Sequence, residues 1–267
     1  MTPLPYRLVA TDLDGTLLSS AETVSERNRA ALALAGAAGA RHIIVTGRGA
    51  RWTRTVFDEI GYTGLAVCAQ GAQVYDAGEH RLLTSLTLDR RLAAAALAKI
   101  EAEIGTMAVA ASQDGLDGEV ITGPGYALEI GTGLPIRRVE RDELLAEPVS
   151  KLYLQHPEHT DDELAAAAER LAGDLVTITM AGPGVVEMLP LGLSKATGLA
   201  VAAHRLGVKG SETIAFGDMP NDVPMFGWAG HGVAMANAHE QLLAVADEVT
   251  AGNDEDGVAV VLERLYG

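Results

Sequence analysis

Short runs of aliphatic residues alternate with helical patterns at both ends of the chain. Each run is short enough for a buried strand, and most are followed by residues with the spacing of an amphipathic helix. In chain order, the expected elements are Leu8–Ala10, Ser25–Ala38, Ile43–Val45, Ala50–Ile60, Leu65–Ala69, Lys195–Leu206, Thr213–Phe216 and Asn221–Gly227. Strands that alternate with helices form βαβ units, so we predict an α/β fold with a doubly wound, mainly parallel sheet.

The middle of the chain has a different pattern. A long Ala-rich helix is expected over Leu88–Ile104, and strands and one further helix follow it, with a turn-rich segment over Gly123–Gly133. For Ala181–Glu187, a loop that faces the substrate and a simple Gly-Pro-Gly turn both remain open. We therefore predict that residues 82–187 form an α+β domain inserted into the α/β core, and that residues 1–81 and 188–267 form that core. Lys151 is expected to be an ordinary lysine at the end of a strand.

Composition narrows the possible partners. The 267 residues are 48% hydrophobic and carry a formal net charge of -16, which disfavours nucleic acid because phosphate-backbone binding depends on Lys and Arg. The chain shows neither a signal-peptide pattern nor an apolar stretch long enough to span a bilayer. We expect a cytoplasmic protein without a membrane partner. A small phosphorylated metabolite remains possible, and the sequence does not predict an oligomeric state.

Polar residues follow three of the predicted strands. In open α/β sheets, ligands bind beyond the carboxyl ends of the strands, so residues that follow different strands converge on one site. The candidate residues, in chain order, are Asp12, Asp14, Thr46, Gly47, Arg48, Asp218, Asn221 and Asp222. A single aspartate in such a position is usually a helix cap, but three converging clusters predict a functional site.

The chemistry of these residues indicates a metal and a phosphoryl group. Several carboxylates repel one another unless a cation lies between them, and oxygen ligands without histidine or thiol suit Mg²⁺. Thr46, Asn221 and Lys195 supply the hydrogen-bond donors that a phosphoryl group requires. A metal and a lysine together would neutralise the charge of a transferring phosphoryl group.

Four motifs resemble those of the haloacid dehalogenase-like superfamily, in the same order and spacing. They are "DLDGT" (Asp12–Thr16), "TGR" (Thr46–Arg48), "LSKATGL" (Leu193–Leu199) and "GDMPND" (Gly217–Asp222). The chain is most similar to Cof-like sugar-phosphate phosphatases, which carry a cap domain between the second and third motifs. The inserted domain matches that cap in position and size more than in sequence.

The resemblance implies a role for each candidate residue. Asp12 corresponds to the nucleophile that becomes an aspartyl-phosphate, and Asp14 to the general acid and base. Mg²⁺ would be held by Asp12, by the backbone carbonyl of Asp14 and by Asp218. The phosphate would be bound by a further group of residues, Thr46, Gly47, Lys195 and Asn221, while Asp222 orients Lys195 or the metal shell. For Arg48, contact with the substrate and a structural salt bridge both remain open.

Two residues depart from the family pattern, since Gln70 and Ala236 stand where the family commonly has Asn and Gly. Neither belongs to the catalytic set, but Gln70 bears on substrate choice. Selectivity is expected to depend on the inserted domain, for instance on Tyr126 or Glu129, because the core motifs contact only groups that every substrate shares.

The function that follows is Mg²⁺-dependent hydrolysis of a small phosphomonoester, such as a sugar phosphate, by a phosphoric monoester hydrolase. Two alternatives stay open. A phosphomutase would use the same motifs and return the phosphoryl group to the substrate. A non-catalytic metabolite-binding module is a further alternative, although such a module has little need for the paired Asp12 and Asp14.

Overall fold

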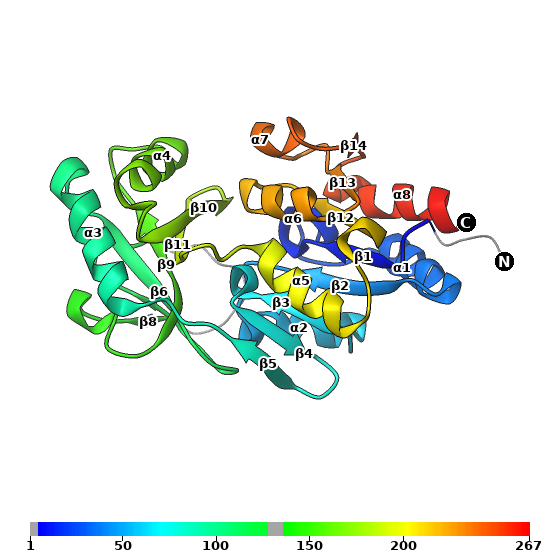
Figure 1. The fold of residues 1–267 in the computed structure, drawn as a ribbon, viewed down its shortest axis with the longest axis horizontal. Coiled ribbons are helices and arrows are strands. Elements are labelled where there is room, and N and C mark those ends of the chain that lie inside the picture. Colours follow the sequence, from blue (N-terminus) through cyan, green and yellow to red (C-terminus); the bar gives the residue numbers. More distant parts are fainter. Residues whose placement is uncertain (1–4, 128–135) are drawn as a thin grey trace. The chain divides into compact units, whose positions relative to one another are not determined.

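The computed structural model describes residues 5–127 and 136–267, which fold into two compact units (Figure 1). Unit 1 comprises Met1–Gly47, Arg54–Leu83 and Ser194–Gly267, and unit 2 comprises Arg48–Thr53 and Thr84–Leu193. The division predicted from the sequence placed the boundaries after residues 81 and 187. In the structure they fall after residues 83 and 193, and the short segment Arg48–Thr53 joins unit 2.

Unit 1 is built on a twisted sheet of mostly parallel strands. The strand order is β14-β13-β12-β1-β2-β3-β4-β5, with parallel pairing from β14 to β3 and antiparallel pairing of β4 with β3. The strands are β1 (Leu8–Thr11), β2 (Arg41–Val45), β3 (Leu65–Cys68), β4 (Gln73–Asp76), β5 (Arg81–Ser85), β12 (Thr213–Gly217), β13 (His231–Ala234) and β14 (Glu248–Val249). Every residue of β1 is buried, as expected for a central parallel strand covered on both faces.

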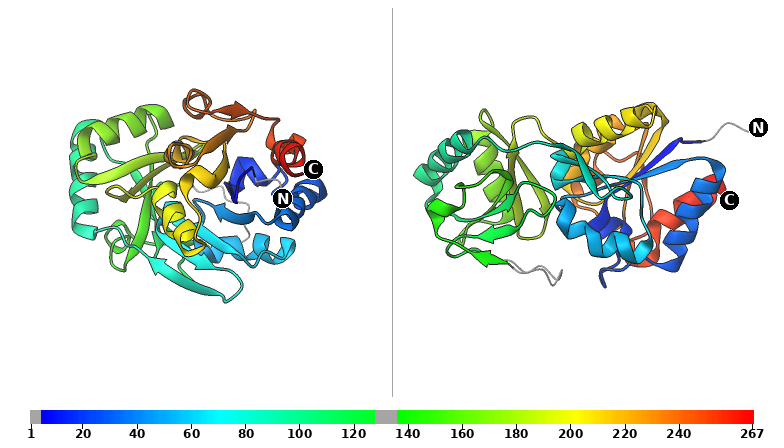
Figure 2. Two further views of the ribbon diagram at one scale, coloured as in Figure 1. Left: turned by 45° about the vertical axis from the view of Figure 1, so that its right-hand side comes forward. Right: turned by 90° about the horizontal axis from the view of Figure 1, so that it is seen from below.

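Helices cover both faces of this sheet, which confirms the predicted doubly wound α/β fold. Side chains of α5 (Lys195–Arg205) and α6 (Val223–Trp228) pack on one face, and α1 (Glu26–Ala38) packs along α8 (Gly257–Tyr266) on the other (Figure 2). The remaining α-helices of the core are α2 (Ala50–Ile60) and α7 (Glu240–Leu243). Within the described ranges, no helix combines the length and the apolar character needed to cross a membrane.

Unit 2 is an α+β fold, as predicted for the inserted segment. Its strand order is β10-β11-β9-β6-β7-β8, and α3 (Arg90–Ile104) and α4 (Asp161–Ala172) contribute to one apolar core with it. The strands are β6 (Ala108–Gln113), β7 (Val120–Thr122), β8 (Arg137–Arg138), β9 (Val149–Gln155), β10 (Val176–Gly182) and β11 (Val185–Pro190).

The structure refines the expected local structure in two segments. Ala181–Glu187 is not a loop throughout, because Val185–Glu187 opens strand β11 and pairs with β10 around the short turn that the Gly-Pro-Gly sequence forms. The Gly-Pro-Gly sequence predicts a turn but does not predict that the residues after it form a strand. The helix expected over Asn221–Gly227 begins only at Val223, since Pro220–Asp222 form a 3₁₀ turn.

Lys151 corrects a third expectation, because it lies inside β9 and is almost fully buried. Its ammonium forms a salt bridge with the equally buried Glu187 of β11 and lies 4.7 Å from the ring centroid of Tyr153. Burial alone would lower the pKa of Lys151, but the Glu187 carboxylate raises it above its usual value. Buried charges require such a partner, and Lys151 and Glu187 provide one for each other inside the sheet.

The same face of the unit 2 sheet carries a small aromatic cluster. Trp52, Tyr126 and Tyr153 are buried together with small aliphatic side chains, and the rings of Tyr126 and Tyr153 lie 6.4 Å apart. The hydroxyl of Tyr153 is hydrogen-bonded to the side chains of Lys151 and Ser112. In contrast, the buried hydroxyl of Tyr126 has no hydrogen-bond partner among the residues described.

Candidate active site

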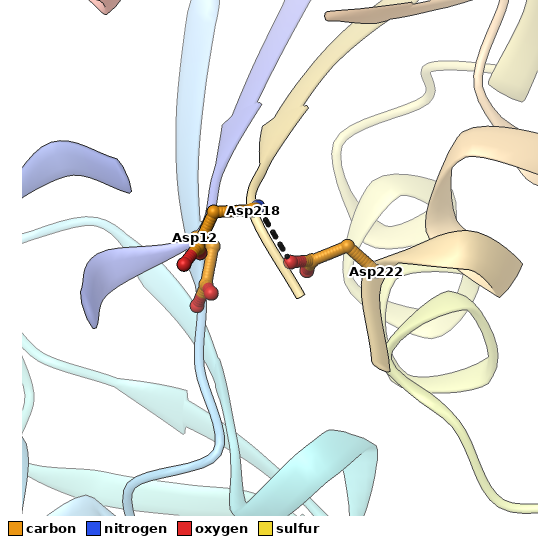
Figure 3. Close-up of side chains that lie close together, drawn as sticks. All are labelled: Asp12, Asp218 and Asp222. Carbon is orange, nitrogen blue, oxygen red and sulfur yellow. Dashed lines mark hydrogen bonds between the residues drawn. The ribbon is translucent and has the colours of Figure 1, made fainter. Parts of the chain in front are cut away.

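Three buried aspartates meet at the carboxyl ends of β1 and β12. Oxygen atoms of Asp12, Asp218 and Asp222 lie within 4.8 Å of one another (Figure 3). The backbone N–H of Asp12 donates to the carbonyl of Phe216 at 2.9 Å, which holds the ends of the two strands side by side. The topology therefore brings together side chains that are about 200 positions apart in the sequence.

Lys195 links two of these carboxylates. It is the first residue of α5, and its Nζ lies 2.9 Å from Oδ2 of Asp12 and 2.7 Å from Oδ1 of Asp222. The other carboxylate oxygen of Asp222 accepts hydrogen bonds from the backbone N–H groups of Asp218 and Met219, at 3.1 and 3.2 Å. Both oxygens of Asp222 are thus engaged by the protein, so Asp222 is placed to orient Lys195.

The loop between β1 and α1 positions Asp218. The hydroxyl of Thr16 donates to Oδ1 of Asp218 at 3.0 Å. Gly15 has a φ of 68°, and a Cβ at this position would collide with the Asp218 carboxylate. Only glycine allows the backbone of this loop to approach the carboxylate so closely.

The charge of the site is strongly negative. Burial, followed by the neighbouring Asp222, raises the pKa of Asp218 to about 7, and burial also raises the pKa of Asp12 well above its usual value. Burial alone would lower the pKa of Lys195, but the carboxylates of Asp12 and Asp222 raise it, so Lys195 stays a charged ammonium beside them. An additional cation is the simplest way to balance this charge, and an oxygen-only donor set suits a hard divalent ion.

Asp14 lies next to this cluster. It is half-buried, in the loop segment Leu13–Leu17, and its charge contributes to the raised pKa of both Asp12 and Asp218. Its side chain is not one of the three clustered carboxylates. The expected roles of Asp14, as a metal ligand through its backbone carbonyl and as the group that transfers protons, stay predictions.

The other predicted phosphate ligands of unit 1 lie at the same end of the sheet. Thr46 is buried at the end of β2, where its N–H donates to the carbonyl of Val67 at 2.8 Å, and the half-buried Gly47 follows it. Asn221 is held by the side chain of Gln70. Arg48, the residue after Gly47, is grouped with unit 2, and its contact with the substrate stays a prediction.

Sequence reasoning did not foresee that Gln70 contacts Asn221. Gln70 was noted only because the family commonly has Asn at this position, and that difference does not indicate which residue Gln70 contacts. The other departure, Ala236, is exposed and is not among the residues with positive φ, so a side chain is tolerated there.

Comparison with known proteins agrees with this geometry. Residues 9–262 match the model of the family described as haloacid dehalogenase-like hydrolase. The chain is 31% identical to "Phosphatase YwpJ" of Bacillus subtilis, an alignment that covers 97% of this chain and 99% of the relative. It is 28% identical to the Bacillus subtilis "5-amino-6-(5-phospho-D-ribitylamino)uracil phosphatase YwtE", over 97% and 98% of the two chains.

A solved structure shows the same fold. A haloacid dehalogenase-like hydrolase from B. subtilis superposes with a TM-score of 0.82 and 26% identity, over 97% of this chain and 99% of that one. The chain therefore belongs to the haloacid dehalogenase-like hydrolases, as its four ordered motifs predicted, and is a phosphatase of that family.

Proposed function

We propose that this protein hydrolyses a small phosphomonoester, with Mg²⁺ as cofactor, through an aspartyl-phosphate on Asp12. The observation that carries the proposal is the contact of the buried Asp12 carboxylate with Lys195, beside Asp218 at the same sheet edge. A nucleophile, a fixed cation for the phosphoryl oxygens and a metal-binding carboxylate are thereby assembled in one place.

The residues fit a divalent ion. Asp12, the backbone carbonyl of Asp14 and Asp218 would hold Mg²⁺, while Asp222 is occupied by Lys195 and two backbone N–H groups. When bound, the ion supplies positive charge to the phosphoryl oxygens and to the attacking carboxylate.

The chain's own residues account for the chemical steps. An oxygen of Asp12 attacks phosphorus while the bond to the leaving oxygen breaks, and Asp14 transfers a proton to that oxygen. In the second step, Asp14 takes a proton from water, the water oxygen bonds to phosphorus, and Asp12 is released together with inorganic phosphate. Lys195, Thr46 and Asn221 hold the phosphoryl oxygens during both steps.

We infer that the organic part of the substrate is a sugar or another polyol. The relative YwtE is named for a phosphate ester of a ribityl group, which is a polyol.

A screen of phosphate esters with Mg²⁺ and with chelator tests this function. We expect release of inorganic phosphate from sugar or polyol phosphates with Mg²⁺, and loss of activity with EDTA. Full activity in chelator would contradict the metal assignment. An isomerised sugar phosphate, formed without free phosphate, would instead identify a phosphomutase.

Substitution of Asp218 tests the metal site directly. Mutating a residue that only hydrogen-bonds to a metal ligand typically lowers metal affinity or activity about 10- to 100-fold. Asp218 is proposed as a ligand itself, so Asp218→Asn should lower both Mg²⁺ affinity and activity by more than about 100-fold. Mg²⁺ titration of activity and calorimetric Mg²⁺ binding measure the two effects. Asp58→Asn, at an exposed aspartate of α2, is the matched control and should behave like the wild type. Unchanged Mg²⁺ binding by Asp218→Asn would refute the assignment.

Tyr126 tests whether unit 2 selects the substrate. Its buried hydroxyl lacks a partner among the described residues, so Tyr126→Phe should not lower the melting temperature. If the hydroxyl contacts the polyol, kcat/KM for a polyol phosphate should fall about fivefold, whereas p-nitrophenyl phosphate is hydrolysed as before. An unchanged substrate ranking would place selectivity elsewhere. Glu129, the other candidate from the sequence, lies outside the described residues.

Tyr153→Phe provides the contrast to this variant. The Tyr153 hydroxyl is hydrogen-bonded to Lys151 and Ser112, so its removal takes one hydrogen bond from each of these two buried side chains. We therefore expect Tyr153→Phe to lower the melting temperature, which distinguishes a structural hydroxyl from one reserved for the substrate.

A further inference from the structure

We infer that the tight turn Ala69–Gly71, between β3 and β4, positions the phosphate-binding residues, and that Gln70 is its positioning residue for Asn221. The inference rests on the proposed function, since it concerns how unit 1 holds the phosphoryl group. The turn contacts three separate segments, and each of them carries or adjoins a predicted phosphate ligand.

The first two contacts are made by Gln70. Its backbone N–H donates to the carbonyl of Thr46 at 3.2 Å. Its side-chain Oε1 accepts a hydrogen bond from Nδ2 of Asn221 at 3.1 Å, and both side chains are buried. One residue therefore connects the end of β2 with the 3₁₀ turn that follows β12.

The third contact is made by Gly71. A Cβ at Gly71 would collide with the carbonyl oxygen of Ser194, and a Cβ at Gly198 would collide with Gly71 itself. Two glycines thus allow the first turn of α5 to pack directly against the β3–β4 turn. Ser194 precedes Lys195, so this packing fixes the helix end that carries the predicted phosphate-binding lysine.

The turn adopts an unfavourable backbone conformation to make these contacts. Ala69, Gln70 and Gly71 have φ angles of 50°, 60° and 106°, so two consecutive residues with side chains lie in the left-handed region. Positive φ is uncommon for such residues, and strained backbone of this kind clusters at functional sites. The contacts of the turn with Thr46, Ser194 and Asn221 offset this cost.

Asn221 has an unfilled hydrogen-bonding capacity that points to a ligand. Its Oδ1 is buried without a hydrogen-bond partner among the described residues, which is rare for a side-chain oxygen. This oxygen can only accept, so it suits a donor such as a hydroxyl or a water molecule, and the phosphoryl oxygen must be bound by Nδ2. Gln70 uses one of the two hydrogens on Nδ2, which leaves the second for a phosphoryl oxygen. By fixing the plane of the Asn221 amide, Gln70 determines where this donor points.

A double-mutant cycle on phosphate binding tests the inference. Gln70→Met keeps the length of the side chain but replaces the amide oxygen with a thioether, which is only a weak acceptor. The dissociation constant of inorganic phosphate is measured calorimetrically with saturating Mg²⁺, together with KM and kcat for p-nitrophenyl phosphate. We expect Gln70→Met to weaken phosphate binding and raise KM about fivefold, with a smaller change in kcat.

The cycle separates positioning from a general structural effect. If Gln70 acts through Asn221, then Gln70→Met combined with Asn221→Ala should bind phosphate as Asn221→Ala alone does. Should Gln70→Met fail to fold, Gln70→Gly replaces it, because glycine adopts a φ of 60° without strain. Gln73→Met, at another buried glutamine of the same hairpin, is the control and should bind phosphate normally.

The outcomes distinguish the inference from the proposed function. The positioning role alone would be overturned if Gln70→Met bound phosphate as tightly as the wild type does. It would also be overturned if the losses of phosphate affinity in the two single variants multiplied in the double variant. A wild-type protein that binds no phosphate and hydrolyses no phosphate ester would overturn the proposed function as well.

Discussion

Asp12→Asn is expected to abolish hydrolysis of every phosphate ester while the protein keeps its fold. An amide cannot attack phosphorus, so the loss in kcat should exceed about 10⁴-fold, as is typical when a nucleophile is removed. The fold should tolerate the change, because Asp12 is a buried carboxylate crowded by two others and its neutral isostere relieves that repulsion. Lys195 retains Asp222 as its partner.

The measurement combines steady-state kinetics with thermal unfolding in chelator. Beryllium fluoride, which mimics an aspartyl-phosphate, should raise the melting temperature of the wild type in the presence of Mg²⁺ and leave that of Asp12→Asn unchanged. Substantial turnover by a folded Asp12→Asn protein would exclude the covalent mechanism.

Asp14→Asn should lower the rate in a way that depends on the leaving group. General acid–base catalysis typically contributes 10²- to 10⁴-fold, so alkyl phosphates should be hydrolysed about 10²- to 10⁴-fold more slowly. p-Nitrophenolate leaves without a proton, so the first step with p-nitrophenyl phosphate should be affected least. Asp14 suits this role because it is half-buried beside the carboxylate cluster but is not a member of it.

Single-turnover kinetics separate the two halves of the reaction. In Asp14→Asn, p-nitrophenolate should be released in a rapid burst, followed by slow release of phosphate, because the base that activates water is missing. Equal rate losses for methyl phosphate and p-nitrophenyl phosphate, without a burst, would argue that Asp14 serves the metal site and not proton transfer.

The fold class and the clustering of the site could be predicted from local patterns. Strand-like runs followed by helical spacing predict a parallel sheet, and residues that follow different parallel strands must meet at one edge. This reasoning placed Asp12 and Asp218 together, and in the structure a carboxylate oxygen of one lies within 4.8 Å of a carboxylate oxygen of the other. The helix expected over Ser25–Ala38 begins at Glu26 in the structure, and Ser25 caps it, with its hydroxyl accepting the N–H of Asn28 at 3.0 Å.

Side-chain pairing across the sheets could not be predicted in the same way. Lys151 and Glu187 are 36 positions apart, and nothing local marks either as buried, because strand pairing alone brings β9 and β11 together. The strand after Gly-Pro-Gly was likewise hidden, since a turn signal does not show that the residues behind it will find a partner strand.

The sequence by itself determined the order of elements, the identity of the carboxylates and the residues able to bind a phosphoryl group, because these depend on periodicity and side-chain chemistry. Only the tertiary structure decided how the groups are shared. In the folded protein, both oxygens of Asp222 accept hydrogen bonds, one from Lys195 and the other from the backbone. An oxygen of Asp218 lies close to Gly15, and Asn221 donates a hydrogen bond to Gln70. Such contacts depend on packing between distant segments, and no local pattern encodes them.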